Sequence, residues 1–128
     1  MPVTGLDHVN IAAADIEVSA RFYADVLGLE RRDGPSIRPP GQLQWMHDPA
    51  GRPIIHLAAA AATRGETVPG PTGAFDHVAL ACGDYEGMIA RLEERGLAYR
   101  TSAVPELRLR QVFIVDPDGV RLELNFRE

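Results

Sequence analysis

Lysine is absent from this chain of 128 residues, and its basic side chains other than histidine are all arginines. Schiff-base chemistry, a pyridoxal anchor and a Walker-type phosphate loop each need a lysine amine, so the composition excludes them. Serine occurs only at Ser19, Ser36 and Ser102, and none of the three lies in a nucleophile-elbow setting. The missing residues therefore remove several large classes of enzyme.

Positive charge, cysteine and long apolar runs are also scarce. The formal net charge is −5 and no dense basic stretch occurs, which excludes the usual footprint of a nucleic-acid-binding protein. The single cysteine, Cys82, cannot form an internal disulfide, and no segment is apolar for long enough to span a membrane. We expect one domain, residues 1–128, in the cytoplasm, with neither nucleic acid nor membrane as a partner.

An internal duplication is the most informative feature that is present. Asp7-His8-Val9 returns as Asp76-His77-Val78. Each copy is followed at the same offset by an Asp and a Glu, and later by an Asp-Pro-x-Gly turn and a short strand-like run centred on His56 or Glu123. The repeat divides the domain into a first module at about 1–58, a linker at about 59–73 and a second module at about 74–128.

Each module is predicted to contain one strand, one helix and about three more strands. Asp15 and Asp84 are suitable helix N-caps, and Gly28 and Gly96 suit the left-handed position after a helix. Further strands are predicted at 43–47, 53–58, 99–102, 110–115 and 120–126. The fold class is therefore α+β, with two tandem βαβββ modules forming a cupped mixed β-sheet and helices on its outer face. Residues 31–42, with three prolines, are predicted to be a loop or lid.

The alternation of side chains along the strands brings possible metal ligands to one face. In the last strand the apolar positions alternate with Glu123, which directs Glu123 to the concave side, where His8 and His77 also point. His56 joins them only if Ile55 and Leu57 pack inward. Imidazole and carboxylate groups suit a divalent ion such as zinc, nickel, iron, cobalt or manganese.

The spacing of His56 differs from that of Glu123. Eight positions separate Asp48 from His56, whereas seven separate Asp116 from Glu123. A β-bulge marked by Pro53 would restore the facing of His56.

Other conspicuous side chains are expected to have ordinary roles. His47, which has no counterpart in the second copy, is expected to be a hydrogen-bonded structural residue, and Trp45 a core or pocket-wall residue. The simplest interpretation of five arginines is solvated surface: Arg31, Arg32, Arg38, Arg108 and Arg110.

A family resemblance covers nearly the whole chain. It is carried by Leu6-Asp7-His8-Val9-Asn10-Ile11, Arg21-Phe22-Tyr23, Val26-Leu27-Gly28-Leu29, Phe75-Asp76-His77-Val78-Ala79, Val115-Asp116-Pro117-Asp118-Gly119 and Leu122-Glu123-Leu124. With these segments the sequence resembles the vicinal oxygen chelate superfamily, which includes glyoxalases, bleomycin-resistance proteins and extradiol dioxygenases. The resemblance implies metal ligation by His8, His56, His77 and Glu123. His56 departs from glyoxalase I enzymes, which usually carry there a Glu that is thought to act as a base.

The function that the resemblance implies is glyoxalase-like. We expect a metal-dependent lyase, isomerase or epimerase that acts on a small oxygen-chelating substrate through a metal-stabilised enediolate, with Glu123 or His56 moving the proton. An extradiol-type dioxygenase, a fosfomycin-type resistance enzyme and a non-catalytic protein that sequesters a small molecule are the alternatives. We also expect a homodimer.

Overall fold

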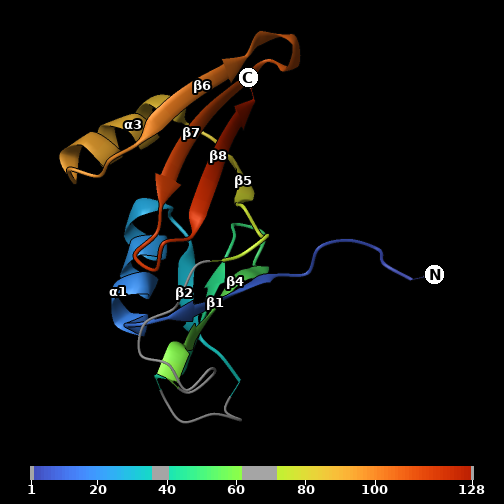
Figure 1. Ribbon diagram of the computed structural model, residues 1–128, viewed down its shortest axis with the longest axis vertical. Helices are drawn as coiled ribbons and strands as arrows, with labels where there is room; N and C mark the ends of the chain where they lie inside the picture. Colours follow the sequence, from blue (N-terminus) through green and yellow to red (C-terminus); the bar gives the residue numbers. More distant parts are fainter. Residues whose placement is uncertain (1, 36–40, 62–71, 128) are drawn as a thin grey trace. The chain divides into compact units, whose positions relative to one another are not determined.

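The computed structural model describes residues 2–35, 41–61 and 72–127. The chain forms two compact units, Met1–Pro69 and Gly70–Glu128, and their boundary lies within the linker that the repeat predicts. Each unit contains a four-stranded mixed sheet and a helix that follows its first strand (Figure 1). The predicted α+β class with two βαβββ modules is confirmed.

The first unit is built from β1 (Val9–Ala13), α1 (Ile16–Arg21) continued by a π-helical segment η1 (Phe22–Val26), β2 (Glu30–Asp33), β3 (Leu43–His47) and β4 (Pro53–Ala59). The strand order is β1-β4-β3-β2. β1 runs parallel to β4, and the other neighbours are antiparallel. The connection through α1 and η1 therefore carries the chain from one edge of the sheet to the other.

The second unit repeats this plan with β5 (Val78–Cys82), α3 (Tyr85–Glu94), β6 (Arg100–Val104), a short 3-10 turn η2 (Pro105–Leu107), β7 (Leu109–Val115) and β8 (Arg121–Arg127). Its strand order is β5-β8-β7-β6, again with the first and last strands parallel. The strands expected at the five ranges given above all form within two residues of the predicted bounds. No helix of the described residues is long and apolar enough to cross a membrane.

Both helices begin and end as the sequence predicts. The carboxylate of Asp15 accepts hydrogen bonds from two N–H groups in the first turn of α1, at 3.0 and 3.3 Å. That of Asp84 accepts one from the first turn of α3, at 3.1 Å. Gly28 and Gly96 follow the helices with φ of 74° and 64°, which a residue without a Cβ adopts at little cost.

The turn before the last strand of each unit is fastened by an aspartate. Asp116 accepts hydrogen bonds at 2.8 Å from the backbone N–H groups two and four residues ahead, and Asp48 does the same at 2.9 Å. Gly119 and Gly51 have φ of 87° and 82°, in the left-handed region that favours glycine. These turns join β7 to β8 and β3 to β4, so each unit closes with a hairpin.

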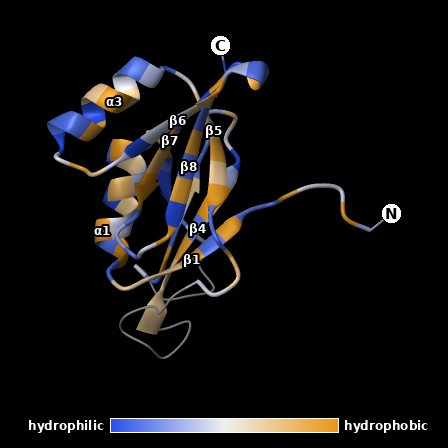
Figure 2. Cartoon of the chain, turned by 45° about the horizontal axis from the view of Figure 1, so that its top comes forward, coloured by the Kyte–Doolittle hydropathy of each residue, from blue (hydrophilic) through white to orange (hydrophobic). Residues whose placement is uncertain are grey.

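Alternation along the last strand divides each sheet into an apolar and a polar face. Leu122, Leu124 and Phe126 of β8 are at most 1% exposed, whereas the residues between them are partly accessible. Bands of hydrophobic and hydrophilic colour follow one another along β8 in Figure 2. The ring of Tyr85 in α3 meets that of Phe126 edge-on at 5.3 Å, so α3 packs on the apolar face and leaves Glu123 on the other.

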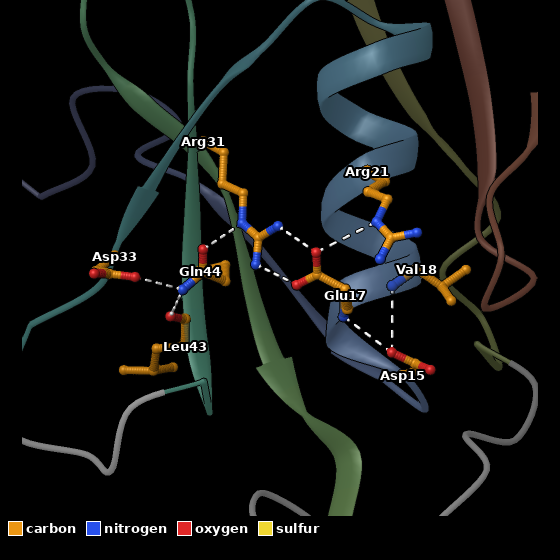
Figure 3. A network of polar contacts seen from close by, with 8 residues as sticks. All are labelled: Asp15, Glu17, Val18, Arg21, Arg31, Asp33, Leu43 and Gln44. Atoms are coloured by element: carbon orange, nitrogen blue, oxygen red, sulfur yellow. Dashed lines mark hydrogen bonds and ion pairs between the residues drawn. The ribbon is translucent and has the colours of Figure 1, made fainter.

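The predicted loop at residues 31–42 is wrong at its start, because β2 includes Arg31 and pairs with β3. The Arg31 guanidinium donates to both carboxylate oxygens of Glu17 in α1, at 2.9 and 2.6 Å, and its Nε donates to Gln44 of β3 at 2.6 Å (Figure 3). This strand lies at the sheet edge and all its side chains are exposed, so no apolar alternation announces it. Residues 36–40 lie outside the described part of the chain.

Candidate functional site

The sheet registers place His56 and Glu123 at equivalent positions. In the first unit Asn10 of β1 lies opposite His56 of β4, and in the second Ala79 of β5 lies opposite Glu123 of β8. Asn10 and Ala79 each stand two residues after the repeated histidine. The last strand of each unit therefore carries one possible ligand at the equivalent position, a nitrogen donor from His56 in β4 and an oxygen donor from Glu123 in β8.

A bulge in β4 produces this equivalence despite the different spacing in the sequence. Met46 pairs with Ile55 and His47 pairs with Pro53, so Ile54 is an extra residue without a partner on β3. The predicted bulge beside Pro53 is confirmed. Ile55 and Leu57 are 1% and 0% exposed, and His56 between them consequently lies on the opposite, polar face.

Each repeated histidine is held by the aspartate that precedes it. Nδ1 of His8 lies 2.6 Å from Asp7 Oδ1, and Nδ1 of His77 lies 2.7 Å from Asp76 Oδ2. These bonds are the largest cause of the lowered pKa of both carboxyl groups. A carboxylate at Nδ1 favours the tautomer whose Nε2 carries a lone pair, which is the arrangement around many metal-binding histidines. This role of Asp7 and Asp76 was not predicted, although the repeated Asp-His pair was its signal in the sequence.

One nitrogen of the His56 ring lacks a hydrogen-bond partner. Its Nε2 is buried with no hydrogen-bond partner among the described residues. Burial, followed by the charge of His8, lowers the pKa of His56, and the nearby Pro53 backbone opposes this with a smaller effect. The lowered pKa favours the neutral ring.

Three aromatic rings form a stack in the first unit. The indole of Trp45 lies parallel to the His56 ring, with centroids 4.0 Å apart and an interplanar angle of 9°. The His8 ring stacks on His56, with centroids 3.6 Å apart and an angle of 14°. Trp45 reaches His56 because the two are directly paired on β3 and β4. Trp45 therefore contacts a predicted ligand, which its sequence position alone did not reveal.

In the second unit His77 and Glu123 approach each other. His77 Nε2 lies 3.6 Å from Glu123 Oε1. Two donor atoms at about 2.1 Å from one ion are at most about 4.2 Å apart, so these two atoms are close enough to share one. The other carboxylate oxygen, Oε2, accepts a hydrogen bond from Asn125 Nδ2 at 3.0 Å, and Asn125 Oδ1 accepts one from Gln111 Nε2 at 3.2 Å. An amide pair thus orients the carboxylate.

The remaining histidine and two of the arginines have structural contacts. His47 is 8% exposed, and its Nδ1 lies 3.3 Å from the Trp45 carbonyl oxygen, as expected of a structural histidine. Arg31 and Arg110 are not simply solvated, contrary to expectation. Arg31 bonds Glu17 as described above. Arg110 donates to Glu86 at 3.1 Å, and its guanidinium lies 4.0 Å from the Tyr85 ring centroid.

Two donor pairs result, each within one unit: His8 with His56, and His77 with Glu123. In the part of the chain that the structure describes, no three His, Cys, Asp or Glu side chains gather into a metal-binding group. The meeting of the two pairs on one ion stays a prediction.

Comparisons with known proteins give one consistent result. Residues 5–124 match the family model of the Glyoxalase/Bleomycin resistance protein/Dioxygenase superfamily. Glyoxylase I 4 of Arabidopsis thaliana is 30% identical over 132 residues, which span 95% of this chain and 70% of the relative.

Two solved structures extend the comparison. Lactoylglutathione lyase from Agrobacterium tumefaciens has a TM-score of 0.69 at 20% identity, covering 98% of this chain and 96% of its own. TnmS3, an antibiotic binding protein from Streptomyces sp. CB03234, has a TM-score of 0.72 at 25% identity and covers 100% of this chain and 99% of its own.

Proposed function

Because the chain belongs to the Glyoxalase/Bleomycin resistance protein/Dioxygenase superfamily, we propose that it is a metal-dependent enzyme for a small substrate with neighbouring oxygens. The proposed reaction is a proton transfer of the lyase, isomerase or epimerase type. The proposed ligands are His8, His56, His77 and Glu123. The native ion is one of zinc, nickel, iron, cobalt and manganese, which all accept nitrogen and oxygen donors.

The observation that carries this proposal is the buried Nε2 of His56, which has no hydrogen-bond partner among the described residues. A buried polar atom without a partner is costly, and a metal ion would offset that cost. Each of the other proposed ligands is held at one side-chain atom by a neighbouring residue, and its second atom stays available for the ion. His8 and His77 are each held at Nδ1 by an aspartate, and Glu123 is held at Oε2 by Asn125, which leaves Nε2 and Oε1 as donors. The donor set fits a divalent ion.

In this proposal a bound ion would supply a Lewis acid that polarises the neighbouring oxygens of the substrate. The chain's own residues move the proton. Oε1 of Glu123 and Nε2 of His56 are the two candidate acceptors, each once it has loosened from the ion, and the lowered pKa of His56 favours a neutral ring that can accept. Trp45, paired across the strands with His56, provides an apolar surface beside that group.

Isothermal titration of chelator-treated protein with Zn²⁺, Ni²⁺, Co²⁺ and Mn²⁺ tests the metal site. We expect H77A and E123A to bind far more weakly than the wild type. H47Q, which changes the histidine outside the set, should bind normally. A wild-type protein that binds none of these ions, or a loss in H47Q equal to that in H77A, contradicts the proposal.

The proton transfer is tested separately with the metal-loaded protein. A hemithioacetal substrate in deuterated water should exchange the hydrogen next to its carbonyl group, as followed by proton NMR. The exchange should be slower in E123Q and H56Q at saturating metal. An absence of exchange with hemithioacetal, hydroxy-acyl thioester and epimerisable diacid substrates alike would count against this reaction class.

Sequestration of a small molecule is a second candidate function, because TnmS3, an antibiotic binding protein, aligns over the whole of this chain. In this case the indole of Trp45 would provide flat apolar surface for a planar ligand. Binding of a polycyclic antibiotic to metal-free protein, with recovery of the unchanged compound, would favour sequestration over catalysis.

We further propose a homodimer, since proteins of this superfamily often form dimers. Sedimentation equilibrium at several protein concentrations tests it. A single species with the mass of one chain, 13.9 kDa, at all concentrations would contradict the dimer.

A further inference from the structure

We propose that Trp45 is a positioning residue, whose indole face holds the His56 ring in the orientation in which Nε2 binds the ion. This inference rests on the proposed metal site and adds a residue to it. It starts from the near-parallel contact of the two rings, with centroids 4.0 Å apart and an angle of 9°.

The support that Trp45 offers is rigid. β3 lies between β4 and β2, so Trp45 is paired on both sides, with His56 and with Arg32. Nε2 of His56 has no hydrogen-bond partner among the described residues, so no bond at that atom fixes the tilt of the ring. A flat surface against one face of the ring limits that tilt. The indole therefore supplies a constraint that the His56 ring needs.

The second unit shows why this constraint is specific to His56. Phe113 is paired with Glu123 as Trp45 is with His56, but the Phe113 ring is occupied by the Arg100 guanidinium, 4.5 Å from its centroid. Glu123 is held instead by Asn125, two residues further along β8. The residue two positions after His56 is Ala58, which has no side-chain donor. A carboxylate can be oriented by an amide, whereas this imidazole depends on the ring beside it.

The geometry of the stack also indicates which ring, His8 or His56, has to move when an ion binds. The planes of His8 and His56 are only 14° from parallel and the ring centroids are 3.6 Å apart, so the lone pairs of the two rings lie in separate, nearly parallel planes. Both can bind one ion only if a ring tilts. His56 lies within β4 against the indole of Trp45, whereas His8 stands before β1 with a side chain 36% exposed. His8 therefore tilts, and the contact between Trp45 and His56 persists when the ion is bound.

The experiment compares W45F, W45L and F113L with the wild type. W45F retains a flat ring and should keep Zn²⁺ affinity within about threefold. W45L removes the ring and should lose about 10- to 100-fold, the usual effect of removing a group that orients a ligand. F113L is the matched control, since it removes the aromatic ring at the equivalent position, and its Zn²⁺ affinity should equal that of the wild type. Titration calorimetry measures all four.

Two spectroscopic readouts separate positioning from a general effect on folding. Long-range ¹H–¹⁵N NMR of metal-free protein should show one His56 tautomer, protonated at Nδ1, in the wild type and W45F, and mixed tautomers in W45L. Trp45 is the only tryptophan, so its emission reports on its neighbour, and Zn²⁺ should change that emission in the wild type but not in H56A.

The outcomes for the two proposals are distinguishable. If the wild type binds Zn²⁺ by calorimetry while W45L has the same affinity and the same His56 tautomer, the role of Trp45 is refuted and the metal site stands. If the wild type gives no binding heat and no emission change, the metal site itself fails, and the role of Trp45 fails with it. If W45L and F113L lose equal affinity, the effect is not specific to His56 and the inference is overturned.

Discussion

Replacement of Asn125 by alanine tests how the second unit prepares its carboxylate ligand. In the wild type, Asn125 Nδ2 donates to Glu123 Oε2 at 3.0 Å, and Gln111 holds the Asn125 amide in the required orientation. The Glu123 side chain is only 16% exposed, so water replaces this bond poorly. In N125A the carboxylate can rotate, and Oε1 no longer has a preferred position beside His77.

The size of the effect follows from the bond that is lost. A hydrogen bond to a charged group contributes about 1.5–3 kcal/mol, and each 1.4 kcal/mol changes a dissociation constant about tenfold. The affinity for the ion should therefore fall by about 10- to 100-fold. Outer groups that orient metal ligands give the same range, about 10- to 100-fold, when they are removed. Two separate estimates thus agree.

Competition titration of N125A with a chromophoric Zn²⁺ chelator measures the change. The control is N10A, which removes the chain's other asparagine, opposite His56 on β1. N10A should bind Zn²⁺ as the wild type does, and Q111A should fall between N10A and N125A. Metal-free N125A should still be folded at the assay temperature, because a loss of about 1.5–3 kcal/mol is smaller than the usual stability of a domain. Equal affinity of N125A and the wild type would refute the argument.

Further predictions concern stability. Leu124 is fully buried, so L124A should lose about 2–5 kcal/mol of unfolding free energy in urea, and a loss no greater than that of the exposed V115A would contradict its place in the core. Gly119 has φ of 87°, so G119A should cost about 1–2 kcal/mol by the same assay, and an unchanged urea midpoint would show that the left-handed turn is not required. The hydrogen bonds from Arg31 lower the pKa of Glu17 from 4.5 to about 2, so the pair stabilises the fold fully above pH 4.5 and loses this effect as the pH falls towards 2. The stability difference between the wild type and E17Q should shrink over that interval, and a constant difference would contradict the assignment.

Local chemistry explains why much of the fold could be predicted. Asp15 and Asp84 cap their helices through hydrogen bonds that span only a few residues, and the Asp-Pro-x-Gly turns close through Asp48 and Asp116 in the same way. The strand period separates Glu123 from its apolar neighbours without reference to the rest of the chain. Such features depend on residues that are near one another in the sequence, and because of the duplication each of them occurs in both modules.

The features that could not be predicted depend on distant residues. β2 is an edge strand of charged side chains, and it is tied down by Glu17 in the preceding helix and by Gln44 on the next strand. The fifteen residues from Glu30 to Gln44 contain no apolar period that would have announced this pairing. The stacking of Trp45 on His56 likewise follows from the pairing of β3 with β4.

The sequence by itself determined the repeated βαβββ modules and the identity of the possible ligands, because caps, turns and alternation are local properties. Tertiary structure decided which groups prepare those ligands. It placed the bulge at Ile54, the indole of Trp45 against one imidazole and the amide of Asn125 against the carboxylate. The physical reason is that the orientation of a side chain depends on what packs and bonds against it, and strand pairing brings those neighbours from elsewhere in the chain.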